Sequence, residues 1–163
     1  MCGIVAVTGY KKALPLLMNG LEKLEYRGYD SAGIAIINSE TNCITCNKAE
    51  GKLKNLISNL NNHNNHNISG TVGIGHTRWA THGKPEVKNA HPHTDSSGNI
   101  AVVQNGIIEN YQELRFQLEK EGIVFNSDTD TEVIPHLIQK ELKIMPSSSN
   151  LFFKSWKFSI MPF

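Results

Sequence analysis

A short run of apolar and partly β-branched residues begins almost at the first position of the 163-residue chain. The run covers residues 4–7 and is bounded by Gly3 and Gly9, which is typical of a buried strand. Leucine and methionine then recur at helical spacing over residues 14–24, with Gly28 as a stop signal. A strand that starts at the chain terminus and leads into a helix favours a fold that mixes both elements in packed layers.

The rest of the chain continues this alternation. Further strands are expected over residues 32–37, 44–48, 72–76 and 100–103. Further helices are expected over residues 51–60, 109–121 and about 129–143, the last opened by a capping box of Thr129 and Glu132. The Asn-rich segment 61–67 and the Gly-, Pro- and His-rich segment 81–98 are expected to form loops. The predicted fold class is therefore α+β.

Composition excludes several classes of protein. A net charge of +1 leaves too little basic excess for an electrostatic nucleic-acid binder. No run approaches the roughly 18 apolar residues that a membrane span needs. The first ten residues have neither a basic n-region nor a cleavage pattern, so a cytoplasmic protein with free thiols is expected.

A zinc site is the first alternative that the cysteines raise. Cys43 and Cys46 have C-x-x-C spacing, and His63 and His66 follow. The gap between the pairs exceeds the usual spacing, and H-x-x-H is shorter than the typical ligand pair. The better interpretation is two unrelated thiols on a strand, so no metal site is expected.

The position of Cys2 matters most for chemistry. A small side chain at this position allows removal of Met1, which would leave Cys2 with the free α-amine. An α-amino group titrates near about 7.8, against about 10.4 for lysine, so it acts as a base near neutrality. One residue then carries both a thiol nucleophile and a general base. A buried structural thiol is the alternative, which position alone leaves open.

Four other residues carry groups that thiol attack on an amide of an amino acid requires. Asn105 and Gly106 follow an apolar run and offer one side-chain amide and one backbone N–H to an oxyanion. Arg78 at a strand end suits a carboxylate, and Asp130 suits an ammonium group. Each also has an ordinary structural interpretation, as a turn, a surface charge or a helix cap.

Six ordered blocks decide between these interpretations: residues 1–5, 25–33, 76–83, 89–93, 104–110 and 127–132. The chain closely resembles the N-terminal glutaminase domain of glutamine–fructose-6-phosphate aminotransferases (isomerizing). These are class II glutamine amidotransferases with the αββα sandwich of N-terminal-nucleophile hydrolases. Related asparagine synthetases and amidophosphoribosyltransferases share the Met-Cys-Gly start and the Asn-Gly turn but lack two of the blocks as written here, 78–83 and 89–93.

The resemblance implies a catalytic role for Cys2, Asn105 and Gly106. Cys2 would attack the side-chain amide of L-glutamine, and its α-amine would pass a proton to the departing ammonia. Asn105 and Gly106 would form the oxyanion hole. Arg78 would hold the glutamine carboxylate, and Asp130 its ammonium group.

The resemblance also implies four further pocket residues. Trp79 would sit on a loop that closes over glutamine, and Thr81 and His82 would line the pocket. Arg27 would lie near the nucleophile. No metal and no cofactor is implied.

The resemblance ends near Lys143, which predicts a partial domain over residues 1–145 and a sandwich incomplete at its C-terminal end. Residues 146–163 contain four of the six phenylalanines and match no period. They are expected to be a divergent tail from truncation or a shifted frame, with a membrane-surface or partner-docking segment as the alternative.

The expected function is glutamine hydrolysis that supplies ammonia for glucosamine 6-phosphate synthesis. The sugar-isomerase domains, which bind fructose 6-phosphate in full-length and homo-oligomeric relatives, are not visible in the sequence. The alternative is an inactive truncated fragment that binds glutamine or a partner without turnover.

Overall fold

A four-stranded antiparallel sheet in the order β1-β4-β2-β3 is the centre of the computed structural model, which describes residues 2–62, 68–79 and 84–144. The first strand pairs with the last, and Gly3 lies opposite Thr77. This register places the beginning of the chain beside the carboxyl end of β4. The strands are β1 (Gly3–Val7), β2 (Ser31–Ile37), β3 (Ile44–Glu50) and β4 (Val72–Arg78).

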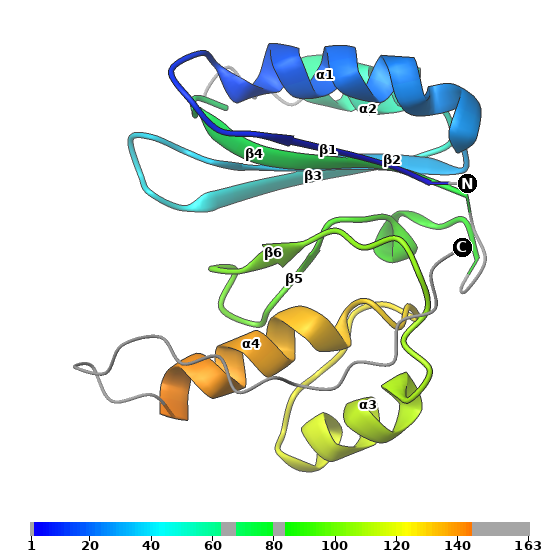
Figure 1. Ribbon diagram of the computed structural model, residues 1–163, viewed down its shortest axis with the longest axis vertical. Helices are drawn as coiled ribbons and strands as arrows, with labels where there is room; N and C mark the ends of the chain where they lie inside the picture. The colour runs from blue at the N-terminus through cyan, green and yellow to red at the C-terminus, as the bar shows by residue number, and fades with distance from the viewer. Residues whose placement is uncertain (1, 63–67, 80–83, 145–163) are drawn as a thin grey trace.

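Two helices, α1 (Ala13–Leu24) and α2 (Leu53–Asn62), cover one face of this sheet (Figure 1). Leu17 and Leu21 of α1 are fully buried, as their helical spacing predicts, and they pack with Ile34 of β2. Burying one such side chain contributes about 1.5–3 kcal/mol. Apolar burial therefore holds the helices to the sheet.

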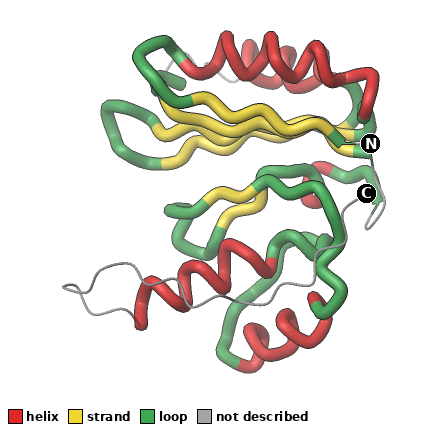
Figure 2. Tube along the Cα trace, viewed as in Figure 1, coloured by secondary structure: helices red, strands yellow, loops and turns green. Residues whose placement is uncertain are grey.

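The second half of the chain packs beneath the opposite face (Figures 1 and 2). A two-stranded ribbon, β5 (His93–Thr94) and β6 (Ala101–Val102), lies nearest the sheet. Helices α3 (Tyr111–Lys120) and α4 (Val133–Ile144) lie beyond it. A second apolar core joins these helices through Ile108, Leu114, Leu118, Val133 and Leu137.

These layers confirm the α+β class and most of the expected elements. The strands expected at 4–7, 32–37 and 72–76 are present as β1, β2 and β4. The helix expected at 109–121 is α3, and Gly122 follows it with a φ of +86°. That left-handed conformation ends a helix at little cost in glycine.

The expected loop over 81–98 is wrong in part. A 3-10 turn, η2 (Val87–Asn89), and the strand β5 lie within it. Both are too short to leave a periodic signal in the sequence. A similar turn, η1 (Glu25–Arg27), ends α1.

The expected capping box at Thr129 and Glu132 is also wrong, since α4 begins only at Val133. The Glu132 carboxylate instead accepts from the backbone N–H groups of Asn126 and Ser127, at 2.8 and 2.7 Å. A buried carboxylate thus organises the loop before the helix rather than the first turn of the helix.

In the part of the chain that the structure describes, no helix has the length and apolar character that crossing a bilayer requires.

Gly33 is where the two halves approach most closely. A Cβ atom at this position would lie 2.2 Å from the carbonyl oxygen of His91 and 3.0 Å from that of Asn47. Neither backbone atom can retreat without moving a strand or the loop before β5. Only glycine allows this contact between the sheet and the second layer.

We therefore expect Gly33→Ala to lower the free energy of unfolding by about 3 kcal/mol or more. Gly98→Ala is the matched control, because Gly98 has a φ of +71° but no neighbour within 4 Å of the added atom. It should cost only about 1 kcal/mol. Urea denaturation of both variants measures the difference, and equal losses would contradict the steric explanation.

Candidate active site

Cys2 lies directly before β1 with its side chain against the backbone of Trp79. The Trp79 N–H donates to the Cys2 Sγ atom at 3.2 Å, and the thiol faces the Trp79 carbonyl oxygen at 3.6 Å. The pairing of Gly3 with Thr77 explains this placement, because Cys2 and Trp79 each lie just beyond that register. The thiol is half-buried and sits at the edge of the sheet.

Asn105 approaches the same point from the second layer. Its Nδ2 group donates to the Cys2 carbonyl oxygen at 3.2 Å. Its Oδ1 atom lies 2.9 Å from Nε2 of His76 on β4. Gly106 follows with a φ of 140°, a conformation that favours glycine. The turn after β6 therefore brings the Asn105 amide to the backbone of Cys2, with Gly106 next in sequence.

Arg78 ends β4 one residue before Trp79, and it is only 4 % exposed. Its Nη1 group donates to the Lys84 carbonyl oxygen at 3.4 Å. Burial lowers the pKa of Arg78, while the nearby charges of Cys2, Asp30 and Asp130 raise it. A buried cation therefore lies within electrostatic reach of both the thiol and two carboxylates.

Asp130 is tied to the turn that carries Asn105 and Gly106. Its Oδ2 atom accepts from the backbone N–H of Ile108 at 2.8 Å, and the Thr131 hydroxyl reaches Oδ1 at 3.4 Å. Asp130 is 6 % exposed, so its carboxylate is held in a defined orientation.

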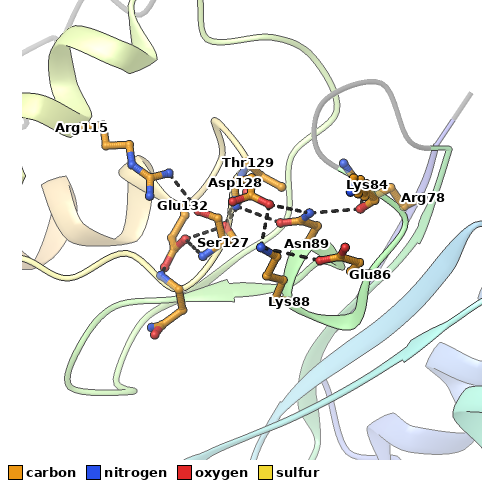
Figure 3. A network of polar contacts seen from close by, with 11 residues as sticks. Arg78, Lys84, Glu86, Lys88, Asn89, Arg115, Ser127, Asp128, Thr129 and Glu132 are labelled. Carbon is orange, nitrogen blue, oxygen red and sulfur yellow. Dashed lines mark hydrogen bonds and ion pairs between the residues drawn. The ribbon is translucent and has the colours of Figure 1, made fainter.

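A polar network joins the loop after β4 to the loop before α4 (Figure 3). The buried Asn89 side chain donates to the Lys84 carbonyl oxygen and to Asp128 Oδ2, at 3.1 and 3.2 Å. It accepts from the Asp128 N–H at 2.9 Å, and Lys88 pairs with the same carboxylate at 2.8 Å. Because Lys84 also accepts from Arg78, this network links the Arg78 region to the loop that holds Asp130.

This arrangement combines a terminal thiol, an amide donor, a buried cation and a buried carboxylate. Those are the groups needed for nucleophilic attack on the side-chain amide of a zwitterionic amino acid. The sequence model of a family described as "glutamine amidotransferase domain" matches residues 41–145.

The chain belongs to this family.

Curated relatives of this glutamine amidotransferase domain carry a more specific name. The chain is 62% identical over 138 residues to the glutamine–fructose-6-phosphate aminotransferase (isomerizing) of Gloeobacter violaceus, covering 85% of the chain and 22% of the relative. It is 57% identical over 151 residues to that of Thermosynechococcus vestitus, covering 93% and 23%. These matches confirm the resemblance predicted from the six blocks. The chain spans about a fifth of the length of these relatives.

Solved structures agree with the fold of the amidotransferase domain. A glutamine phosphoribosylpyrophosphate amidotransferase from B. subtilis, complexed with ADP and GMP, superposes with a TM-score of 0.69 at 29% identity. It matches 86% of this chain and 29% of its own chain. A structure described as the allosteric regulatory enzyme of purine biosynthesis gives a TM-score of 0.71 at 31% identity, with 86% and 30% covered.

The remaining predicted pocket residues are placed less centrally or lie outside the described residues. Trp79 is 43 % exposed, and its ring meets the edge of Tyr29 at 5.3 Å. Arg27 lies in η1, with its guanidinium 5.8 Å from the Tyr26 ring. Thr81 and His82 fall outside the described residues, so their predicted roles stay predictions.

Three buried histidines of the amidotransferase domain were missed as site residues by sequence reasoning. The rings of His76 and His91 stack with centroids 4.3 Å apart, and His93 meets the edge of His91 at 4.7 Å. His93 Nε2 then lies 2.9 Å from the Thr129 hydroxyl. The clue in the sequence was that His76 lies in the same predicted strand as Arg78, but no spacing rule connects it to Asn105.

Burial keeps these imidazoles neutral. It lowers the pKa of His76 to about 4 and that of His91 well below 6.5. Burial likewise lowers the pKa of His93, with the Lys48 cation adding to the effect. The stack is therefore an uncharged polar column between the sheet and the second layer.

All three cysteines are free thiols, and Cys46 on β3 has a pKa raised by burial. Within residues 2–62, 68–79 and 84–144, no group of three or more His, Cys, Asp or Glu side chains is arranged to hold a metal ion. His63 and His66 lie outside those ranges.

Proposed function

We propose that this chain is the glutaminase part of a glutamine–fructose-6-phosphate aminotransferase and hydrolyses L-glutamine through a thioester on Cys2. One observation carries the proposal: Cys2 contacts both the end of β4, through Trp79, and the Asn105 amide from the second layer. The layers of helix, sheet, ribbon and helix support the αββα sandwich of N-terminal-nucleophile hydrolases.

The proposed reaction begins after removal of Met1. The free α-amine of Cys2 takes the thiol proton, and the sulfur attacks the side-chain carbonyl carbon of glutamine. The resulting oxyanion accepts from Asn105 Nδ2 and from the Gly106 N–H. Collapse breaks the C–N bond, and the protonated α-amine returns its proton to the leaving ammonia. Water then attacks the thioester and releases glutamate.

Substrate recognition falls to two buried charges. Arg78 binds the α-carboxylate of glutamine, and Asp130 accepts from its α-ammonium group. Trp79, Thr81, His82 and Arg27 complete the pocket. Both charges are nearly inaccessible without substrate, at 4 % and 6 % exposure, so their desolvation is already largely complete before glutamine binds.

We assign this function to residues 1–145 and treat 146–163 as a separate, divergent tail. Glucosamine 6-phosphate formation needs a site for fructose 6-phosphate, which we place in a sugar-isomerase part that those 145 residues do not contain. The full-length assembly would be homo-oligomeric and would use the ammonia without metal or cofactor in the glutaminase site.

The test is steady-state hydrolysis by the purified chain. We expect glutamate and ammonia in equal amounts from L-glutamine, and intact mass without Met1. Glutamine binding by calorimetry with no glutamate release, together with retained Met1, would instead identify a non-catalytic binding fragment. L-Asparagine, one methylene shorter, is the control substrate and should be hydrolysed far more slowly.

Arg78→Gln should raise the KM for glutamine by about 100-fold, because it removes a charge-assisted bidentate contact worth roughly 2–3 kcal/mol. The kcat at saturation should change much less, since the contact exists in ground and transition states alike. Lys140→Gln is the control, because Lys140 pairs with Glu121 at the surface. Initial rates over a glutamine series measure both constants. An unchanged KM in Arg78→Gln would remove Arg78 from the binding site.

A further inference from the structure

We propose that His76 is a positioning residue, which holds the Asn105 side-chain amide in the one orientation that directs an N–H toward the oxyanion beside Cys2. The inference rests on the proposed function and adds to it a residue that touches neither glutamine nor the reacting atoms.

The two ends of the Asn105 amide have different partners. Nδ2 donates to the Cys2 carbonyl oxygen at 3.2 Å, and Oδ1 lies 2.9 Å from His76 Nε2. Rotating the amide by half a turn would set Oδ1 against the Cys2 carbonyl, placing two acceptors face to face. Oδ1 therefore points to His76, and His76 Nε2 is the donor.

The hydrogen-bond inventory of Asn105 shows what this contact achieves. An amide nitrogen carries two hydrogens, and one of them is used by the Cys2 carbonyl. The second is left for the oxyanion of the tetrahedral intermediate. Without the His76 contact, the amide can rotate and present its oxygen to the developing negative charge. Preorganised donors are what lower the barrier in such sites.

The His76 ring is well suited to hold this position. It is 1 % exposed, and within the described residues its Nδ1 atom has no hydrogen-bond partner. The ring stacks on His91 with an interplanar angle of 16°. The neutral imidazole has a single N–H, which the orientation of Asn105 assigns to Nε2, and the adjoining Gln104 backbone also interacts with the ring. Stacking fixes the ring plane, so the donor cannot swing away.

The stack also connects the two halves of the site. His91 meets His93, whose Nε2 lies 2.9 Å from the Thr129 hydroxyl, one residue before Asp130. The stacked rings therefore contact Asn105, the proposed oxyanion donor, at one end, and Thr129, next to the proposed ammonium acceptor Asp130, at the other. The column belongs to the scaffold, whereas its first member, His76, contacts the catalytic amide directly.

Two isosteric amides at position 76 test the inference in the full chain. Glutamine places its Nε2 donor near the position of the imidazole Nε2, whereas asparagine reaches only the position of Nδ1. We expect His76→Asn to lower kcat by about 100-fold, as for loss of one oxyanion donor. KM should stay within about threefold because Arg78 and Asp130 are untouched. His76→Gln should restore kcat to within about fivefold of the parent.

A double-mutant cycle separates positioning from damage to the fold. In an Asn105→Ala background, His76→Asn should lower kcat by less than about threefold, because the amide that it orients is gone. Thermal unfolding of each variant accompanies the kinetics. Equal kcat in the His76→Asn variant and the parent, or a 100-fold loss that persists in the Asn105→Ala background, would overturn the inference.

The same assays distinguish this failure from failure of the proposed function. If the parent releases glutamate and Cys2→Ala does not, the function stands whatever His76 does. If the parent releases none, the proposed function fails and the His76 role fails with it.

Discussion

Replacing Cys2 with alanine is expected to lower kcat for glutamate release by at least about 10⁴-fold. In the proposed reaction the sulfur forms the covalent intermediate, and removal of such a nucleophile costs about 10⁶ in kcat in a well-studied hydrolase. The residual rate would come from Asn105, Gly106 and the binding charges, which still favour the tetrahedral state. Coupled detection of glutamate by glutamate dehydrogenase covers this range.

The chain offers a matched control for this change. Cys43 is an exposed free thiol directly before β3, the edge strand opposite β1, and its Sγ atom faces the Thr41 carbonyl oxygen. Cys43→Ala should retain the parental rate. A Cys2→Ala variant that is folded by circular dichroism and keeps more than about one hundredth of the parental kcat would exclude the thioester mechanism.

Retention of Met1 should lower kcat nearly as much as loss of the Cys2 thiol. The α-amine would then be locked in a peptide bond, and the only base proposed for the thiol proton would be absent. Comparing rates of the processed and unprocessed forms, sorted by intact mass, isolates this contribution.

The second large effect is expected in the pH dependence of the free energy of unfolding. Below pH 6.5 the unfolded chain binds a proton at each histidine, whereas His76, His91 and His93 stay neutral in the fold because burial lowers their pKa. The unfolded state then holds more protons, so the free energy of unfolding falls as the pH falls. Each such histidine costs about 1.4 kcal/mol per pH unit, and three cost about 4.

The pKa values of the histidines set the pH range over which stability is lost. The loss begins near pH 6.5 and, for His76, continues to its folded pKa of about 4. At pH 5, His76 and His93 alone would remove roughly 4 kcal/mol, a large part of the whole stability of a typical domain, and His91 acts in the same direction. The cations Lys48 and Arg78 face the stack and oppose its protonation, whereas Glu132 near His93 favours it.

Glu132 adds a second, more acidic phase. The His136 imidazole, 3.8 Å from Oε1, and hydrogen bonds from Asn126 and Ser127 outweigh burial and hold the pKa of the Glu132 carboxyl well below its ordinary 4.5. A group with a depressed folded pKa stabilises the fold above its unfolded value and loses that contribution as the pH falls below it. This loss therefore starts near pH 4.5, after the histidine phase is well advanced.

Urea denaturation at half-unit steps from pH 7.5 to 4.5 measures both the size and the slope of the effect. His76→Gln removes one of the three titrating groups, so its slope should be about one third smaller than that of the parent. A free energy of unfolding that stays constant between pH 7 and 5 would mean that the stack accepts protons in the folded state.

Local sequence patterns were sufficient for the elements that bury an apolar face. Strands β1, β2 and β4 have apolar β-branched runs, and α1 has leucines at helical spacing, so each appeared at its predicted place. Strand β5 has only two residues, both polar, and it forms because β6 pairs with it beneath the sheet. No local preference encodes such an element.

The error at α4 has a similar cause. Thr129 and Glu132 have the spacing of a capping box, but the Glu132 side chain is drawn to the N–H groups of Asn126 and Ser127. The Thr129 hydroxyl is likewise engaged by His93. Loop residues just upstream engage Glu132, and His93 engages Thr129, so neither side chain caps the helix and α4 begins only at Val133.

The sequence by itself determined the chemical groups of this glutamine amidotransferase domain, namely a thiol at position 2, an Asn-Gly turn, and a charged residue at 78 and at 130. Only the tertiary structure decided that His76 faces Asn105 and that three histidines form one column between the layers. The physical reason is distance along the chain. Short motifs identify reactive groups because their residues are neighbours in the sequence. His76 and Asn105 are 29 positions apart, so their contact depends on how β4 packs against the turn after β6.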